Sequence, residues 1–308
     1  MERNASRSQV REFMLIVGPA VILVAAAFWL AFQFVEPAPP KTVKLSAGNA
    51  AGAYYAFAER YRTILARSGI TLEIASSAGS VENLARLDDA SSGFKIALLQ
   101  GGIADQRSAP GLVSLGRVFL EPMWVFYRGD PIDRLARLAG KRIAVGMPGS
   151  GTRVLAETLL KLNSIDASNA TLVAKGGKVA ADALVAGEVD AVFLALAAQS
   201  PLVDTLMRAE GVRLLSFAQA EAYSRLLPYL LPVTLPAGIV DLVGGLPPED
   251  VTLLAAKAAL VARDDTHPAI LELMAAAARE VHGGGGMFQR AEEFPKAHDP
   301  EFPVADEA

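Results

Sequence analysis

The stretch that decides the fold is residues 42–67, TVKLSAGNAAGAYYAFAERYRTILAR. It begins with a short apolar pattern typical of a strand, at residues 42–47. A loop of small residues follows, and then Tyr54, Phe57 and Tyr61 recur at helical spacing. A strand, a small-residue loop and a helix in this order indicate the first half of a βαβ unit.

Short apolar runs alternate with helical patterns along the rest of the chain. Strands are predicted at 71–76, 95–100, 141–146, 171–174, 189–194 and 212–217. Residues 112–127 hold two further β-rich runs, which Glu121 and Pro122 separate. Such alternation predicts an α/β fold with mainly parallel sheets, covered by helices on both faces. The segment from residue 283 loses the helical period and is expected to be an irregular wrap or a loose end.

Composition excludes several classes of protein. The 308 residues include no cysteine, which rules out disulfides and cysteine zinc sites. With 29 basic and 33 acidic side chains the formal net charge is −4, and no basic stripe is visible, so no nucleic-acid partner is expected. His267 is predicted to begin a helix, and His282 to make a favourable contact with a helix C-terminus. No metal-ligand spacing is found, and no cofactor is expected.

An uncharged apolar segment near the N-terminus predicts a membrane anchor. Residues 13–35, FMLIVGPAVILVAAAFWLAFQFV, would reach about 34 Å as a helix, enough for a hydrocarbon core of ~30 Å. Arg3, Arg7 and Arg11 precede it, so residues 1–12 are expected in the cytoplasm of a bacterium. Residues 36–41 form a Pro-rich linker, and the body follows on the periplasmic side. The alternatives are a buried helix and an uncleaved signal sequence.

Three loops combine a strand end, small residues and a helix start. They are residues 46–55 (SAGNAAGAYY), 76–83 (SSAGSVEN) and 146–153 (GMPGSGTR). Backbone N–H groups at such helix starts, together with the helix dipole, favour an anion, and ligands of α/β sheets gather at this edge. The alternative is ordinary turn and N-cap chemistry, with Ser80 and Ser150 as caps.

The third loop does not match the known enzyme motifs that it partly resembles. Thr152 and Arg153 stand where a phosphate-binding loop needs Lys and Ser or Thr, and the hydrolase elbow is missing around Ser150. We therefore assign no catalytic residue and interpret the chain as a binding protein.

The sequence resembles the TAXI family of solute receptors for TRAP transporters, a branch of the periplasmic binding proteins. The resemblance runs from about residue 41 to the end. It rests on Tyr54-Tyr55, on residues 79–84 (GSVENL), on Gln100, and on residues 140–146 (GKRIAVG) leading to 149–152 (GSGT). Residues 189–193 and 232–238 fit as well.

The resemblance implies a two-lobed, type II-like clamshell that closes on a small organic anion, a carboxylate or an amino acid. A TRAP permease in the membrane would then accept the ligand. Lobe 1 is expected at 42–127 plus 228–308, and lobe 2 at 128–227. Carried over by motif, the ligand-binding residues are Gly48, Asn49, Tyr54, Ser80, Gln100, Ser150 and Thr152.

Two features depart from the family. Residues 51–53 are Ala-Gly-Ala where Gly-Gly-Thr is usual, which removes one hydroxyl and leaves the ligand open. The anchor resembles that of a membrane-tethered subgroup. A tethered sensor or interaction module with the same fold is the alternative function, and an α/β enzyme using a loop Ser or Asp is a third.

Overall fold

The computed structural model describes residues 13, 17–30, 38–197 and 199–308. The chain divides into two compact units, Met1–Pro39 and Pro40–Ala308. The second unit, termed the body below, holds every strand and helix that bears on the candidate site.

In the first unit, residues 17–30 form a helix with exposed apolar side chains, including Leu23 and Phe28. The predicted span at 13–35 lies partly outside the described residues, and the predicted cytoplasmic segment 1–12 lies wholly outside them. Within the described part of the chain, no helix has both the length and the apolar character needed to cross a bilayer.

The body alternates strands and helices, as predicted. The strands are β1 (Thr42–Ser46), β2 (Thr71–Ala75), β3 (Phe94–Gln100), β4 (Leu112–Arg128), β5 (Arg142–Ala144), β6 (Thr171–Val173), β7 (Ala191–Ala195), β8 (Val212–Leu214), β9 (Leu230–Leu235) and β10 (Val251–Arg263). The α-helices are α2 (Ala53–Ala66), α3 (Ser80–Asp88), α4 (Gly151–Leu162), α5 (Gly177–Val185), α6 (Pro201–Met207), α7 (Ala220–Leu226) and α8 (Pro268–His282). Two 3₁₀ turns are Ala90–Ser92 and Leu135–Leu138.

The strands join in one mixed sheet across the described residues of the body. Its order is β2-β1-β3-β10-β4-β7-β5-β6, with β8 paired to β4 and β9 to β10. β1 is parallel to β2 and β3, and β5 is parallel to β6 and β7. The long strands β4 and β10 run antiparallel to each other and to their other neighbours. The prediction of mainly parallel pairing is therefore right at the two ends of the sheet and wrong in its centre.

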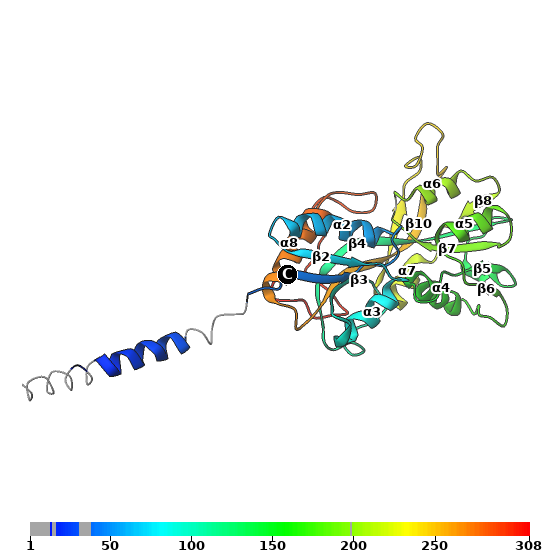
Figure 1. Cartoon of the computed structure of the whole chain (residues 1–308). Helices are drawn as coiled ribbons and strands as arrows, with labels where there is room; N and C mark the ends of the chain where they lie inside the picture. The colour runs from blue at the N-terminus through cyan, green and yellow to red at the C-terminus, as the bar shows by residue number, and fades with distance from the viewer. Residues whose placement is uncertain (1–12, 14–16, 31–37, 198) are drawn as a thin grey trace, which may run out of the picture. The chain divides into compact units, whose positions relative to one another are not determined.

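The body has two lobes that share the strands β4 and β10. Figure 1 shows β2, β3, α2 and α8 at one end of the body, and β5, β6, β8, α4 and α5 at the other. One hydrophobic core joins Val118 of β4 and Leu260 of β10 to the first group of elements. A second core joins Val125 of β4 and Leu254 of β10 to the second group. Each of these two strands therefore contributes one part of its length to the first core and another part to the second. The lobe limits predicted at 127/128 and 227/228 stay predictions.

The prediction that Glu121 and Pro122 interrupt the strand is wrong, because β4 is continuous over 17 residues. Pro122 stands where β4 exchanges partners: β10 pairs with it as far as Met123, and β7 pairs from Met123 onward. A proline has no N–H to donate, and such a residue is tolerated where regular pairing ends or shifts. The sequence break therefore marks the crossing between lobes within one strand.

His282 has a side-chain contact that the sequence did not predict. The ring is buried, and Nε2 lies 2.6 Å from the hydroxyl of Tyr61. Burial lowers the pKa of His282 to about 3, so the ring is neutral at physiological pH. His282 is the last residue of α8, at the predicted helix end, but a neutral ring carries no charge to interact with the helix dipole. His267 does begin a helix, since its side chain accepts a hydrogen bond from the Ala269 N–H at the start of α8.

Candidate functional site

The three loops predicted to form one site meet where the lobes face each other. A Cβ atom built on Gly79 would lie 3.0 Å from the Cα of Ser150, and one built on Gly149 would lie 3.1 Å from the Cβ of Ala78. A Cβ on Gly48 would lie 3.9 Å from the Cα of Gly79. We term this region the interlobe junction; it comprises residues 46–52, 76–80, 100–102 and 146–152.

Gly79 is required at the junction for two independent reasons. Its φ of 138° and ψ of −158° belong to a region that essentially only glycine adopts. Any side chain would also meet the backbone of Ser150 across the junction. Gly79 immediately precedes α3, so this conformation also sets where that helix begins.

The second lobe contributes the start of α4. Ser150 is the N-cap: its Oγ accepts a hydrogen bond from the Arg153 N–H at 3.3 Å and donates to the carbonyl of Met147 at 2.7 Å. The first turn of the helix has no acidic residue. Unpaired N–H groups and the positive end of the dipole therefore remain available to a negative group at this end of a 12-residue helix.

The first lobe contributes the amide of Gln100, which faces the same helix start. Its backbone N–H donates to Ser80 Oγ at 3.0 Å, and the residue is 4% exposed. A Cβ on Gly151 would overlap Gln100 Oε1, so the amide lies directly against the first residue of α4. Gln100 Nε2 is buried without a hydrogen-bond partner. A buried amide donor without an acceptor is costly, and here it marks a place for an acceptor atom.

A buried tyrosine–carboxyl pair lies next to Ser80, which also accepts from the Gln100 backbone N–H. Tyr54 Oη donates to Glu121 Oε2 at 3.1 Å, and both residues are 8% exposed. Burial raises the pKa of Glu121 to about 7. Burial, and then the charge of Glu121, raise the pKa of Tyr54 well above its ordinary value, while hydrogen bonding with Ser80 acts against the rise.

A second buried network fixes the loops of the first lobe. The Asn83 side chain accepts hydrogen bonds from the hydroxyls of Ser46 and Ser77, each at 2.6 Å. Its Nδ2 donates to the Leu98 carbonyl at 2.9 Å. One asparagine on α3 therefore joins the ends of β1, β2 and β3, which holds the loops that follow them in register.

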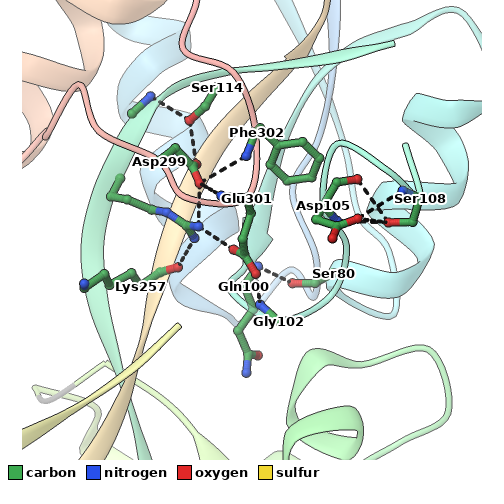
Figure 2. Close-up of polar contacts among 12 residues, drawn as sticks. Ser80, Gln100, Gly102, Asp105, Ser108, Ser114, Lys257, Asp299, Glu301 and Phe302 are labelled. Atoms are coloured by element: carbon green, nitrogen blue, oxygen red, sulfur yellow. Dashed lines mark hydrogen bonds and ion pairs between the residues drawn. The ribbon is translucent and has the colours of Figure 1, made fainter. Parts of the chain in front are cut away.

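An ionic cluster lies against Gly101, the residue after Gln100, and Figure 2 shows its contacts. Arg117 of β4 donates to Asp299 at 2.6 Å, forms an ion pair with Glu301, and donates to the Lys257 carbonyl of β10 at 2.7 Å. Glu301 accepts from the Gly102 N–H at 2.7 Å, two residues beyond Gln100. The segment after residue 283 is thus an ordered wrap: Asp299 and Glu301 fix its end to the first lobe, whereas Phe294 packs in a core with elements of the second.

The seven residues predicted for ligand binding divide into two groups. Tyr54, Ser80, Gln100 and Ser150 have the junction contacts described above, and Gly48 lies against the Tyr54 ring, with 3.6 Å between its built Cβ and Tyr54 Cδ2.

The other two predicted residues have local roles. Asn49 is exposed, and its Oδ1 accepts from the Ala51 N–H at 2.9 Å within its own loop. Thr152 lies half-buried in the first turn of α4.

Sequence reasoning missed Glu121, Asn83 and the Arg117 cluster. Glu121 carries a usable signal, because it is the one acid in a long apolar strand pattern. The partners of Asn83 and Arg117 lie up to about 180 residues away and have no signal in a single sequence.

The junction suits the binding of an oxyanion better than catalysis. Ser150 Oγ gives its proton to a carbonyl and serves as a cap, so it is not activated as a nucleophile. Among the residues that the structure describes, no group of three or more metal-binding side chains is placed to hold an ion.

A separate open hollow lies away from the junction. It has a volume of about 490 Å³ and lies between the start of α8 and residues 304–307. Asp264, Asp306 and Glu307 line it, and this acidic lining is unsuited to an anion.

Solved structures define the class of fold. A protein of Bordetella bronchiseptica RB50 is similar with a TM-score of 0.51 and 17% identity, over 79% of this chain and 71% of that one. The alkanesulfonate-binding protein SsuA from Xanthomonas axonopodis pv. citri, bound to MOPS, has a TM-score of 0.50 and 16% identity, over 80% and 74%. At this identity the likeness concerns the fold, which is the α/β fold of periplasmic binding proteins.

The family follows from the sequence. Residues 45–277 match the NMT1-like family, so the chain belongs to the NMT1-like family. No curated protein matches the sequence.

Proposed function

We propose that this chain is an extracytoplasmic solute-binding protein that closes on a small organic anion. The observation that carries the proposal is the buried amide of Gln100 in one lobe: its Oε1 lies against the start of α4 in the other lobe, and its Nε2 has no hydrogen-bond partner. An anionic oxygen at this point would accept from the amide and from helix N–H groups at once. Because the two donors come from different lobes, the ligand would favour the closed arrangement.

The ligand class we propose is a carboxylate or an amino acid. The TAXI resemblance of the sequence supports this class, and the sulfonate ligands of the structural neighbour SsuA also carry an oxyanion on a small organic body. Every member of this class presents the acceptor oxygens that Gln100 and α4 lack.

Delivery to a TRAP-type permease and a single-pass anchor at residues 13–35 complete the proposal. Both rest on the sequence: on the TAXI motifs, on 23 uncharged residues, and on the basic residues before them. An anchor would hold the receptor near a membrane transporter and raise its effective concentration there.

A thermal-shift screen of the full chain tests the binding proposal. The panel pairs each carboxylate, amino acid and alkanesulfonate with its uncharged amide or ester. We expect stabilisation by at least one anion and none by its uncharged partner, because ligand that binds only the native state raises the melting temperature.

Charge variants locate the site. Gln100→Glu places a negative group against α4 and is expected to abolish the shift. Gln219→Glu adds the same charge at an exposed position before α7 and should leave the shift intact. Equal shifts in both variants, or no shift from any anion with folded, ligand-free protein, would contradict the proposal.

A further inference from the structure

The loop between β9 and β10 projects from the second lobe. Figure 1 shows it in yellow, reaching beyond α6 at the top of the view. Its apolar tip, defined as Ile239, Leu242 and Val243, is exposed by 46%, 86% and 101%. Leu242 and Val243 are the most exposed of the large apolar side chains in the described part of the chain. Both side chains are therefore largely exposed to water in the isolated body.

The loop is built to hold this tip outward. The Gly238 N–H donates to the Pro247 carbonyl at 2.9 Å, and the Leu246 N–H donates to the Asp241 carbonyl at 2.9 Å. The Asp241 side chain accepts from the Gly244 N–H at 2.8 Å and from Arg208 at 3.1 Å. These bonds tie the loop to itself and to α6, so the apolar side chains cannot fold back onto the lobe without breaking them.

We propose that the apolar tip inserts into the headgroup–acyl boundary of a phospholipid bilayer. This inference rests on the anchor in the proposed function. The linker at 36–41 spans about 19 Å when extended, and a body of this length has a radius of gyration of about 18 Å. A tether raises the effective concentration of the body at the surface, so a contact too weak to act alone becomes populated.

The charge around the tip favours neutral lipid over a headgroup-specific contact. Residues 236–250 contain no lysine or arginine. Asp241 is paired with Arg208, and Glu249 and Asp250 are exposed at the base of the loop. The loop itself has no cation to attract anionic headgroups, and Arg208 is already paired with Asp204 and Asp241, so apolar burial is the attraction that remains.

Single-cysteine labelling tests the insertion, because the chain has no cysteine of its own. Val243→Cys in the full chain is labelled with the fluorophore NBD and mixed with phosphatidylcholine vesicles. We expect a blue shift of emission, strong quenching by brominated acyl chains, and protection from aqueous iodide. Val179→Cys, 61% exposed on α5 of the same lobe, is the matched control and should show none of these changes.

A second variant separates insertion from mere proximity. Ile239→Cys carries the label with Leu242 and Val243 both changed to Ser. We expect the NBD response at position 239 to fall roughly tenfold or more relative to the same label with the native tip, because most of the buried apolar area is lost.

Two separate measurements distinguish insertion of the apolar tip from membrane anchoring by residues 13–35. Flotation of the full chain with the vesicles tests the anchor. If the chain does not float, an N-terminal His tag and nickel-chelating lipid supply the tether, so the NBD response at position 243 tests the tip in either case. Unchanged emission at 243 would overturn the insertion. A blue shift without quenching by brominated lipid would overturn it too, because the label would then lie against protein.

Discussion

The two lobes bring different chemistry to the interlobe junction. The second lobe contributes backbone N–H groups at the start of α4, where Ser150 is the N-cap and has a glycine on either side. The first lobe offers buried side chains, those of Gln100, Tyr54 and Glu121. A backbone donor is fixed once the helix forms, whereas a buried side chain depends on everything packed around it. The second lobe should therefore supply general attraction for an anion, and the first lobe should decide which anion fits.

The ion pairs of the two lobes also differ, in how deeply they are buried. Arg117 and Asp299 in the first lobe are almost wholly buried, with side chains 3% and 0% exposed. In the second lobe, Arg142 and Asp190 form an ion pair with side chains 47% and 31% exposed. Substitutions in the buried ion pairs of the first lobe should consequently lower the free energy of unfolding far more than substitutions in the exposed pairs of the second lobe.

The largest effect is expected at Arg117. Arg117→Ala leaves Asp299 and Glu301 buried without their cation, which should lower the free energy of unfolding by about 3–5 kcal/mol. Arg225→Ala removes an exposed pair with Glu221 in the second lobe and should cost about 0–0.5 kcal/mol. Urea unfolding of both variants measures the contrast, and losses of similar size would show that the buried cluster is not a support.

Glu121 should make the free energy of unfolding depend on pH. Its pKa rises from 4.5 to about 7 on burial, so between these values the native state holds a proton that the unfolded chain has lost. Stability must then fall as pH rises from 4.5 to 7, by roughly 3 kcal/mol in total, and stay level above. Glu121→Gln removes this loss.

The measurement is the difference between the wild type and Glu121→Gln in urea unfolding at pH 5 and pH 8. His282 acts with the opposite sign, since its lowered pKa costs stability as pH falls below 6.5, but it contributes equally to both proteins. Glu249→Gln, at an exposed site, is the control. A difference that does not change between the two pH values would contradict the buried, protonated carboxyl.

Substitution of Gly79 tests the close contact between the two lobes at the interlobe junction. Gly79→Ala strains a backbone that suits glycine alone and places a methyl group against Ser150, so we expect a loss of about 1–3 kcal/mol and a more open body. Gly69→Ala is the matched control, because Gly69 also has a positive φ but has no atoms near its built Cβ. Small-angle scattering should show a larger radius for the first variant only. Equal radii would mean that the junction is not a close interlobe contact.

The smallest effect is expected from the cap of α4. Ser150→Ala should lower the free energy of unfolding by about 1 kcal/mol and weaken anion binding only slightly, since the helix N–H groups remain. Ser200→Ala, at the start of α6 where the side chain makes no capping bond, should be close to neutral. A loss of binding as large as that of Gln100→Glu would show that the Ser150 hydroxyl itself contacts the ligand.

The sequence predicted the repeating elements well, because their signals are local. Strand and helix patterns around Thr42, Ser80 and Gly151 depend on periodicity, capping and glycine, all of which a single chain displays. The same local rules pointed to the three loops that meet at the junction.

What the sequence did not predict depends on partners distant in the chain. The pattern of β10, VTLLAAKAALVAR, has no alternation because both faces are buried, and its alanines suit a helix as well as a strand. Pro122 suggested a break because the exchange of strand partners around it is not visible in one sequence. The bond between Glu301 and Gly102 joins residues 199 positions apart, and no local rule reports it.

A crystal structure of the full chain with its retained ligand, or with the strongest stabiliser of the screen, tests the central claim most directly. The account predicts an anionic oxygen within hydrogen-bonding distance of both Gln100 Nε2 and a first-turn N–H of α4. A ligand bound in the acidic hollow beside α8, or one that leaves the Gln100 amide without an acceptor, would contradict it.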